Sequence, residues 1–583
     1  MTADVPTADV PAADAHGSGP VAQPWASDRW SLEVRGDELA DVRCDGRVAL
    51  RAIRAVARDE DWATAWPREV RVDAHADTLT LSLEIADLGL ELAGTLRVTA
   101  EGDRLRVDLD LEARADSSTN RTGLVVLHPP QLAGTPLQVT HPDGGDSETL
   151  FPVQVSPHQP ARDIAGLAWA ADGLPLRLEL AGDVFEMEDQ RNWTDASFKT
   201  YSRPLEEPFP YTLPAGERVR QSLVLTAGAR VGGAADANTS AGGDARAGVP
   251  EELTWHRGGT VPLIGTGHLD LELADPTWPA RLDAALAEAL AGTRSGLALW
   301  VVYPSPADPS ALAELGRRLT AAAAAGAELR FVGIADVARH VTTPELATAL
   351  RAVLPEAIPV VGGARSHYTE LNREWETVLA AGPSALAFAT TPLFHTLETE
   401  QLIEAVAMQR LLAGQLTARA PGLPVHVGPI TLRARFANVA TRPQPVPAPA
   451  PPLDPRAGSP LHAAWTVASA AALSVAGVTS LTFGDADAFR AGGTADAGAA
   501  ASARGASPAG QTSPAHDAAS PVPALAGLAG RPLSTGRSAD SLLWAIGDGE
   551  TLLLANLSPR PRRVLLPGRD APVSLDPISW SAL

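Results

Sequence analysis

The sequence predicts a multidomain protein of mixed class: an N-terminal antiparallel β-sandwich, a central TIM-type (β/α)8 barrel and a small C-terminal β-domain. A two-residue hydrophobic period near the N-terminus and a strand–helix alternation farther along carry this prediction. At 583 residues the chain is also too long for one hydrophobic core. The expected parts are a disordered leader (1–28), the β-sandwich (29–227), a linker (228–254), the barrel (255–490), a low-complexity insertion (491–535) and the C-terminal β-domain (536–583).

The first folded part contains short runs in which apolar and polar residues alternate. Leu-Thr-Leu-Ser-Leu-Glu-Ile at 79–85 and Leu-Arg-Val-Asp-Leu-Asp-Leu-Glu at 105–112 are examples. Half-buried antiparallel strands require this period, because successive side chains point to opposite faces of a sheet. The segment before this part lacks periodicity, and the one after it is rich in Gly, Ala and Asn, as a linker is.

The period changes from about Val261 onward. Short apolar runs predict strands at 297–303, 329–334, 358–361, 386–390, 425–430 and 478–483. Amphipathic runs between them predict helices at 279–291, 310–325, 343–354 and 398–416. Such repeats form right-handed crossovers around a parallel sheet, and their number favours a closed barrel over an open sheet.

Two interruptions and a final β-unit follow from composition. A proline-rich loop covers 443–455, and residues 491–521 are Ala, Gly and Ser of low complexity that need not pack. Apolar runs at 542–546, 551–557 and 563–566 predict the strands of the C-terminal domain.

Charge and cysteine content exclude several classes of partner and site. The 47 basic and 69 acidic residues give a net charge of −22, which opposes binding to nucleic acid and to anionic membranes. Cys44 is the only cysteine, so the chain has no internal disulfide and no multi-cysteine metal site. Without a signal peptide or a long apolar segment, we expect a cytoplasmic protein. The sequence does not reveal the oligomeric state.

Four stretches combine charged, aromatic and histidine residues without core periodicity. They are 51–64 (RAIRAVARDEDWAT), the His- and Pro-rich stretch 121–160, 185–201 (FEMEDQRNWTDASFKTY), and 362–373 (GGARSHYTELNR) with 391–398 and 427–433. Together they resemble the D-apionate lactonase family over roughly residues 45–490, and EMEDQRNWTD is the most specific part. The resemblance implies the same three-domain order. It also implies hydrolysis of D-apionolactone to D-apionate, a step in the breakdown of apiose.

Opening a lactone requires a base that activates water, a group that stabilises the oxyanion and an acid for the departing alkoxide. In a barrel these groups belong where strands end and βα-loops begin. We expect Glu370 or His395 to be the general base. The expected substrate-binding residues of the barrel are Arg365, His367, Asn372, Arg373, Glu398 and Arg435. Glu398 is equally consistent with a simple helix-start carboxylate, and Arg435 and Asn438 with an ordinary loop pair.

The polar block in the β-domain has two interpretations. It contains the further expected binding residues Glu188, Asp189, Arg191 and Trp193, near Glu186, Asn192, Asp195, Lys199 and Tyr201. The block could complete the pocket at the barrel mouth, with Trp193 stacking on a sugar ring. It could instead be a charge-paired domain interface, in which Arg191 and Lys199 neutralise the carboxylates.

A metal is the less favoured alternative, and we expect no cofactor. His128, His141, Asp143 and His158 could in principle bind a divalent ion, but they lack a compact ligand spacing and each His adjoins a Pro.

Two other functions compete with the lactonase. A glycoside hydrolase would pair Glu370 with Asp485, although the strand at 478–483 leads into Asp485 and Asp487 where a glutamate would be expected. A non-catalytic sugar-binding protein on the same scaffold is the third hypothesis.

Overall fold

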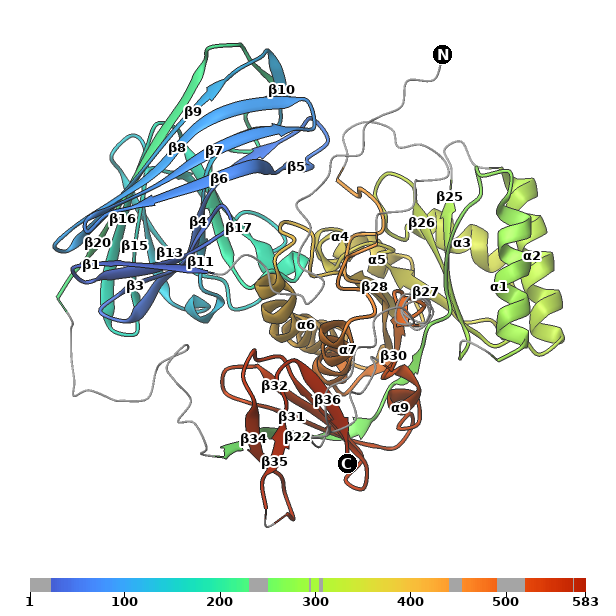
Figure 1. Ribbon diagram of the computed structural model, residues 1–583. Coiled ribbons are helices and arrows are strands. Elements are labelled where there is room, and N and C mark those ends of the chain that lie inside the picture. Colours follow the sequence, from blue (N-terminus) through green and yellow to red (C-terminus); the bar gives the residue numbers. More distant parts are fainter. Residues whose placement is uncertain are drawn as a thin grey trace, which may run out of the picture. The chain divides into compact units, whose positions relative to one another are not determined.

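The computed structural model of the chain describes residues 22–229, 250–292, 295–303, 308–439, 453–489, 519–569 and 571–583. The described chain divides into two compact units (Figure 1). The first contains the N-terminal part to Arg191 and continues from Ala196. The second contains Asn192–Asp195 and nearly all of the described chain from residue 250 onward.

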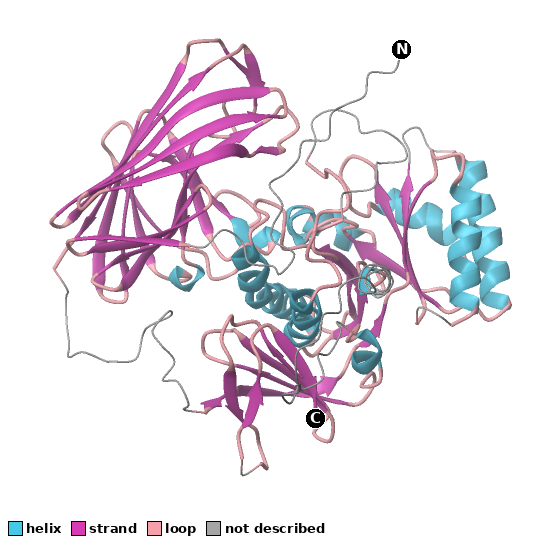
Figure 2. Cartoon of the chain, in the orientation of Figure 1, coloured by secondary structure: helices cyan, strands magenta, loops and turns pink. Residues whose placement is uncertain are grey.

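The first unit is built from two nine-stranded antiparallel sheets, and Figure 2 shows it as almost entirely strand. One sheet has the order β1-β2-β3-β4-β11-β18-β17-β14, with β5 on β4, and the other β13-β12-β15-β16-β20-β9-β8-β7-β6. The first sheet comprises β1 (Gln23–Ser27), β2 (Trp30–Arg35), β3 (Glu38–Cys44), β4 (Arg47–Arg58), β5 (Thr64–Ala65), β11 (Arg121–His128), β14 (Ala161–Ile164), β17 (Phe185–Asp189) and β18 (Phe198–Tyr201). The second comprises β6 (Pro67–Ala74), β7 (Thr78–Asp87), β8 (Leu90–Glu101), β9 (Arg104–Ala113), β12 (Pro136–Thr140), β13 (Asp146–Leu150), β15 (Gly166–Ala171), β16 (Leu174–Ala181) and β20 (Arg218–Ala227).

The two-residue period explains these sheets. Along β9 every second side chain is buried, and its leucines and valine join one core with residues of the other sheet. The predicted N-terminal β-domain is therefore confirmed. The start of the fold differs from the prediction, because β1 lies inside the expected leader. Trp25 is buried there and draws the strand into the sheet, while residues 1–21 lie outside the described part.

The second unit contains an eight-stranded parallel sheet in the order β23-β30-β29-β28-β27-β26-β25-β24. Its strands are β23 (Leu263–Gly265), β24 (His268–Glu272), β25 (Leu297–Tyr303), β26 (Leu329–Asp336), β27 (Val360–Gly363), β28 (Leu386–Thr390), β29 (Val425–Ile430) and β30 (Val478–Phe483). The two outermost strands, β23 and β24, are separated by only two residues of chain, so the ends of the sheet are at most about 11 Å apart there.

Helices alternate with these strands, as the sequence predicts. They are α1 (Trp278–Leu290), α2 (Pro309–Ala324), α3 (Pro344–Val353), α4 (Tyr368–Arg373), α5 (Trp375–Ala380), α6 (Thr399–Arg419) and α7 (Pro460–Leu473). Helices α3 and α7 begin in the same way: a Thr or Ser side chain accepts a backbone hydrogen bond and the next residue is Pro. The central TIM barrel domain is thus confirmed. The short helices α4 and α5, which follow β27, were not among the predicted helices, and neither was α7.

Small β-sheets form the C-terminal part. A five-stranded sheet runs β22-β31-β32-β33-β36, and a three-stranded sheet runs β21-β34-β35. The strands are β21 (Glu251–Glu252), β22 (Thr254–Thr260), β31 (Pro532–Arg537), β32 (Leu543–Gly547), β33 (Leu552–Asn556), β34 (Arg562–Leu565), β35 (Val573–Leu575) and β36 (Ser579–Ala582). Strands β21 and β22 come from the expected linker and barrel start. They pair with β34 and β31, so this β-unit also uses chain that precedes the barrel.

Two predicted segments of low sequence complexity lie largely outside the described residues. The linker falls mostly in 230–249, and the insertion mostly in 490–518. The described end of the insertion forms helix α9 (Val522–Ala526) and strand β31. In the described part of the chain, no helix has both the length and the apolar character needed to span a membrane.

Candidate active site at the barrel strand ends

A pocket lies where three neighbouring barrel strands end. It is lined by Ser366, His367, Ala389, Thr390, Thr391, Thr431, Arg435 and Phe436. These residues belong to the ends of β27, β28 and β29 or to the loops that directly follow them. The carboxyl ends of parallel strands meet at one edge of a sheet, and barrel enzymes bind their substrates at that edge. Of the expected binding residues, His367 and Arg435 line this pocket.

A histidine–carboxylate pair lies beside the pocket. Nδ1 of His395 is 2.6 Å from Oδ2 of Asp195, and Nε2 of Gln401 donates to the other oxygen, Oδ1, at 2.5 Å. Asp195 belongs to the four-residue segment Asn192–Asp195 that folds with the second unit. Since an ionised carboxylate can only accept, the Nδ1 atom of His395 carries the proton in this bond. The pair therefore orients the imidazole and leaves Nε2 as its basic nitrogen.

Aromatic rings connect this pair to the pocket wall. Trp193 stacks on Phe394 with ring centroids 4.5 Å apart and an interplanar angle of 10°. Trp193 and Phe394 each also contact the rings of both His367 and His395, at 4.8 to 5.5 Å between centroids. Phe394 covers one face of the Trp193 indole, and the expected stacking of Trp193 on a sugar ring stays a prediction. The indole also packs against both histidines.

His367 presents a neutral imidazole to the pocket. It precedes α4, and burial lowers the pKa of His367 to about 3, assisted by the nearby His395 and His340. At neutral pH this ring can donate or accept a hydrogen bond but carries no charge.

Glu370, the other expected base, is held by protein donors. Its Oε2 accepts from Ser366 Oγ at 2.8 Å, and its Oε1 accepts from Asn438 Nδ2 at 2.7 Å. Burial raises the pKa of Glu370, against the lowering effect of these hydrogen bonds. Ser366 lines the pocket, whereas Glu370 is not among the lining residues. Its contacts suit the support of two loops.

Arg435 is held in the pocket by β24, a strand that was not predicted from the sequence. Its Nη1 forms an ion pair with Asp270 and lies 3.2 Å from His268 Nε2, and its Nη2 donates to the backbone oxygen of Arg365. His268 and Asp270 alternate along β24. Two polar residues at a two-residue spacing shortly before the first predicted helix, 279–291, were the signal that could have revealed them.

Arg365 takes a supporting position next to the pocket. Its Nε is 3.2 Å from His340 Nδ1, and its guanidinium lies over the ring of Phe436, 4.0 Å from the centroid. Phe436 lines the pocket, so Arg365 fixes the orientation of that ring.

Three other expected binding residues, Asn372, Arg373 and Glu398, are not among the residues that line this pocket. Asn372 Nδ2 donates to Asn192 Oδ1 at 2.9 Å, and Asn372 Oδ1 accepts from Arg419 at 2.7 Å. The guanidinium of Arg373 lies 5.9 Å from the Trp193 ring. Glu398 immediately precedes α6, and its side chain makes no capping hydrogen bond. The protein thus holds Asn372 at both ends of its amide, and the expected contact of Asn372 with sugar hydroxyls stays a prediction.

The polar block divides between the two units. Asp189 and Arg191 form a buried ion pair in the first unit at 2.7 Å, and Asp189 also accepts from the backbone N of Ser156. Glu188 pairs with Lys199 at 2.6 Å. These pairings correspond to the predicted neutralisation of the block by its two cations. Only the four residues that follow Arg191 join the second unit.

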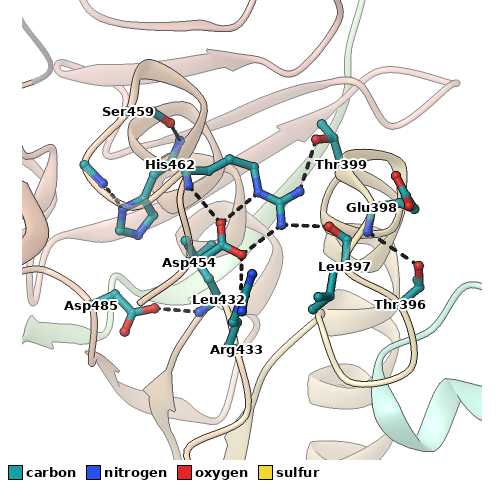
Figure 3. A network of polar contacts seen from close by, with 12 residues as sticks. Thr396, Leu397, Glu398, Thr399, Leu432, Arg433, Asp454, Ser459, His462 and Asp485 are labelled. Atoms are coloured by element: carbon teal, nitrogen blue, oxygen red, sulfur yellow. Dashed lines mark hydrogen bonds and ion pairs between the residues drawn. The ribbon is translucent and has the colours of Figure 1, made fainter. Parts of the chain in front are cut away.

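Asp485 belongs to a different network, shown in Figure 3. Its Oδ2 accepts from the backbone N of Leu432 at 2.6 Å. Nearby, Asp454 accepts from Arg433 at 2.9 Å and from Arg456 at 2.8 and 2.9 Å. Glu370 and Asp485 therefore have different hydrogen-bond partners, and their pairing in a glycoside hydrolase stays a prediction.

The expected metal-binding candidates do not converge in the described residues. His128 is buried in the first unit, where its Nε2 contacts Thr200 Oγ1 at 2.9 Å and burial lowers its pKa to about 3. His141 instead contacts the backbone oxygen of Asp163 and the hydroxyl of Ser147. No group of three His, Cys, Asp or Glu side chains in the described ranges could hold a metal ion.

A polar pocket beside a histidine–carboxylate pair at the carboxyl ends of parallel strands places this chain in the class of TIM-barrel enzymes. Two family models match it in order: the D-apionate lactonase N-terminal domain over residues 13–230 and the D-apionate lactonase TIM barrel domain over 259–527. The chain belongs to the D-apionate lactonase family.

Individual proteins were also compared with the chain. It is 27% identical over 462 residues to the D-apionate lactonase of Brucella anthropi, covering 70% of this chain and 72% of that protein. A galactose mutarotase-like protein from Lactobacillus casei is 9% identical over 36% of this chain and 100% of its own, with a TM-score of 0.26. An α-galactosidase from Geobacillus stearothermophilus is 9% identical over 96% of this chain and 99% of its own, also with a TM-score of 0.26.

Proposed function

We propose that this chain is a lactonase that hydrolyses D-apionolactone to D-apionate in the breakdown of apiose. Family membership and the named relative in Brucella anthropi support the lactonase role. The single observation that carries the proposal for the site is the 2.6 Å contact between His395 and Asp195 beside the pocket. It supplies an oriented base at the edge of the barrel where substrates bind.

In the proposed mechanism His395 is the general base and Asp195 is a positioning residue. Nε2 of His395 removes a proton from water, and the resulting hydroxide attacks the carbonyl carbon of the lactone. Asp195, bonded to Nδ1, stabilises the imidazolium that forms. Gln401 holds Asp195 in turn, so a chain of hydrogen bonds fixes the base before the substrate enters.

Arg435 stabilises the oxyanion of the tetrahedral intermediate in this scheme. Its side chain lines the pocket and is fixed by Asp270, His268 and the backbone of Arg365. A charged donor held in place before the reaction costs little reorganisation when negative charge develops. The intermediate then collapses: the ring C–O bond breaks and the alkoxide takes the proton from His395. The acid product loses its own proton to solvent as D-apionate.

The test is acid release by the purified chain from D-apionolactone, measured at constant pH. A parallel reaction contains a chelator, and a panel of aryl glycosides is the control for the competing reaction. Rapid acid release that the chelator does not reduce, without glycoside cleavage, is the expected result. Cleavage of an aryl glycoside without lactone opening would refute the proposal, and loss of activity with chelator would refute its metal-free form.

A further inference from the structure

The first unit contains a second group of buried ionisable side chains that the proposed reaction does not use. Glu188 lies opposite Lys199 and Glu186 opposite Tyr201, in register between β17 and β18. The Tyr201 hydroxyl donates to Glu186, which also accepts from the backbone N of Leu205 at 2.7 Å. Arg121 of β11 lies over the Tyr201 ring, with its Cζ 3.9 Å from the centroid.

Arg121 is the cation of this group that forms no ion pair in the described chain. It is 5% exposed, and its Nη2 donates to the backbone oxygen of Arg203 at 2.8 Å. Its Nε has no hydrogen-bond acceptor, and no carboxylate within the described ranges forms an ion pair with it. A buried guanidinium is costly unless its charge is balanced and its donors are satisfied. The unsatisfied Nε donor of Arg121 therefore favours an acceptor such as a carboxylate next to it.

Two aromatic residues, Trp62 and Phe209, lie beside the guanidinium of Arg121. The Cζ of Arg121 is 5.1 Å from the centre of the Trp62 ring, and Trp62 meets Phe209 edge-on at 5.0 Å. Phe209 is 41% exposed, so this side of the group reaches solvent. Trp62 itself has a φ of 69°, a left-handed conformation that is strained for a bulky side chain. Exposed aromatic rings beside polar groups are suited to the C–H face of a sugar.

The charges nearby narrow the class of ligand. Lys199 is the only lysine in a chain with 47 basic residues, and its amine lies 4.8 Å from the same Tyr201 ring. Burial lowers the pKa of Lys199 to about 8, with Glu188 opposing this effect and Arg121 adding to it. Glu186 and Glu188 would repel a doubly charged phosphate. The same oxygens can accept hydrogen bonds from sugar hydroxyls, so a singly charged, polyhydroxylated anion fits best.

We propose that the face of the first unit around Arg121, Trp62 and Lys199 binds a sugar acid. Arg121 holds the carboxylate, and Trp62 packs on the carbon chain. This binding is separate from lactone opening and is measured without any turnover. Failure of the sugar-acid site would therefore leave the proposed lactonase untouched, and the reverse also holds.

The single lysine provides a local probe of this site. The full-length chain is acetylated with an N-hydroxysuccinimide ester at about pH 8, near the pKa of Lys199, and modification of Lys199 is followed by mass spectrometry. Sodium gluconate is the sugar-acid probe, glucose is the neutral control and inorganic phosphate is the simple-anion control. Gluconate should slow the labelling of Lys199 several-fold, whereas glucose and phosphate should not.

Two variants locate the anion. Arg121→Gln should weaken protection by gluconate about tenfold or more, because it removes a charge-assisted contact. Arg97→Gln changes an exposed arginine of the same unit and should preserve protection. Labelling of the wild-type chain that gluconate does not slow would overturn the proposal, even if Arg121→Gln failed to fold. Equal protection by phosphate would overturn the assignment to sugar acids.

Discussion

Two polar networks in the second unit differ in how completely they are satisfied. In the network of Figure 3, both oxygens of Asp454 accept hydrogen bonds from arginines, and Arg456 also donates to the backbone oxygen of Leu397. Around the pocket, by contrast, buried atoms lack protein partners within the described ranges, among them Thr390 Oγ1, Glu272 Oε2 and Asn438 Oδ1. A buried polar atom without a partner costs about 1–3 kcal/mol. We call the network around Asp454 the closed network, because its polar atoms have protein partners, and it is suited to hold loops. We call the polar groups around the pocket the open network, and they are suited to receive a polar ligand.

The largest difference between the two networks is expected when the proposed base beside the pocket is removed. His395→Gln should lower kcat for lactone opening by about 10³-fold, because glutamine cannot take the proton from water. Stability should change little, since the amide can still donate to Asp195. Steady-state kinetics at several pH values would measure the effect. A loss below about tenfold would show that His395 is not the base.

The closed network should respond in stability more than in catalysis. Burial alone would raise the pKa of Asp454, but hydrogen bonds from Arg456 and Arg433 lower it to about 2. Asp454→Asn leaves these two arginines without their counterion and should destabilise the second unit by about 3 kcal/mol. A thermal unfolding scan would measure the loss. If Asp454→Asn unfolded at the wild-type temperature but lost most of its kcat, the closed network would serve catalysis and not stability.

Histidines in both networks predict the same pH dependence of stability. Burial lowers the pKa of His367 in the pocket to about 3 and that of His462 in the closed network to about 4, from an ordinary 6.5. Because the folded chain takes up these protons less readily, the stabilisation is complete above pH 6.5 and decreases as the pH falls towards these values.

The expected loss is on the order of 2 kcal/mol per histidine by about pH 5. Thermal unfolding scans between about pH 5 and pH 7 would measure this loss of stability. His462→Gln is a variant in the closed network and His367→Gln the matching one in the open network. Each should reduce the dependence on pH, and unfolding that is insensitive to pH in the wild-type chain would contradict this account of both networks.

The smallest expected effect concerns one pocket hydroxyl. Thr390→Val keeps the shape of the side chain but removes an oxygen that has no protein partner in the described structure. Stability should stay within about 1 kcal/mol, and KM for the lactone should rise about two- to tenfold, the value of one neutral hydrogen bond. A clear loss of stability with unchanged KM would show that Thr390 serves the fold.

The periodic parts of the fold could be predicted from the sequence because each period has one physical cause. Alternation along 105–112 became β9, and five of the six predicted barrel strands overlap observed strands almost residue for residue. The third, expected at 358–361, is observed two residues later as β27.

The site could be predicted only in part. His367, His395 and Arg435 follow strands, so their place at the strand ends was predictable. The pairing of His395 with Asp195 was not, because 200 residues separate them and no local pattern encodes such a contact. The contacts of Asn372 could not be predicted either, because its partners Asn192 and Arg419 lie 180 and 47 residues away in the sequence.

The most direct test of base-activated water as the nucleophile is lactone opening in water enriched in oxygen-18. Base-activated water that attacks the carbonyl places one heavy oxygen in the carboxylate of D-apionate and none in the newly formed hydroxyl. We expect this labelling at the full rate for the wild-type chain and for Asp454→Asn kept below its unfolding temperature. For His395→Gln we expect almost no labelled product. Label in the hydroxyl, or equal rates for wild type and His395→Gln, would contradict this mechanism.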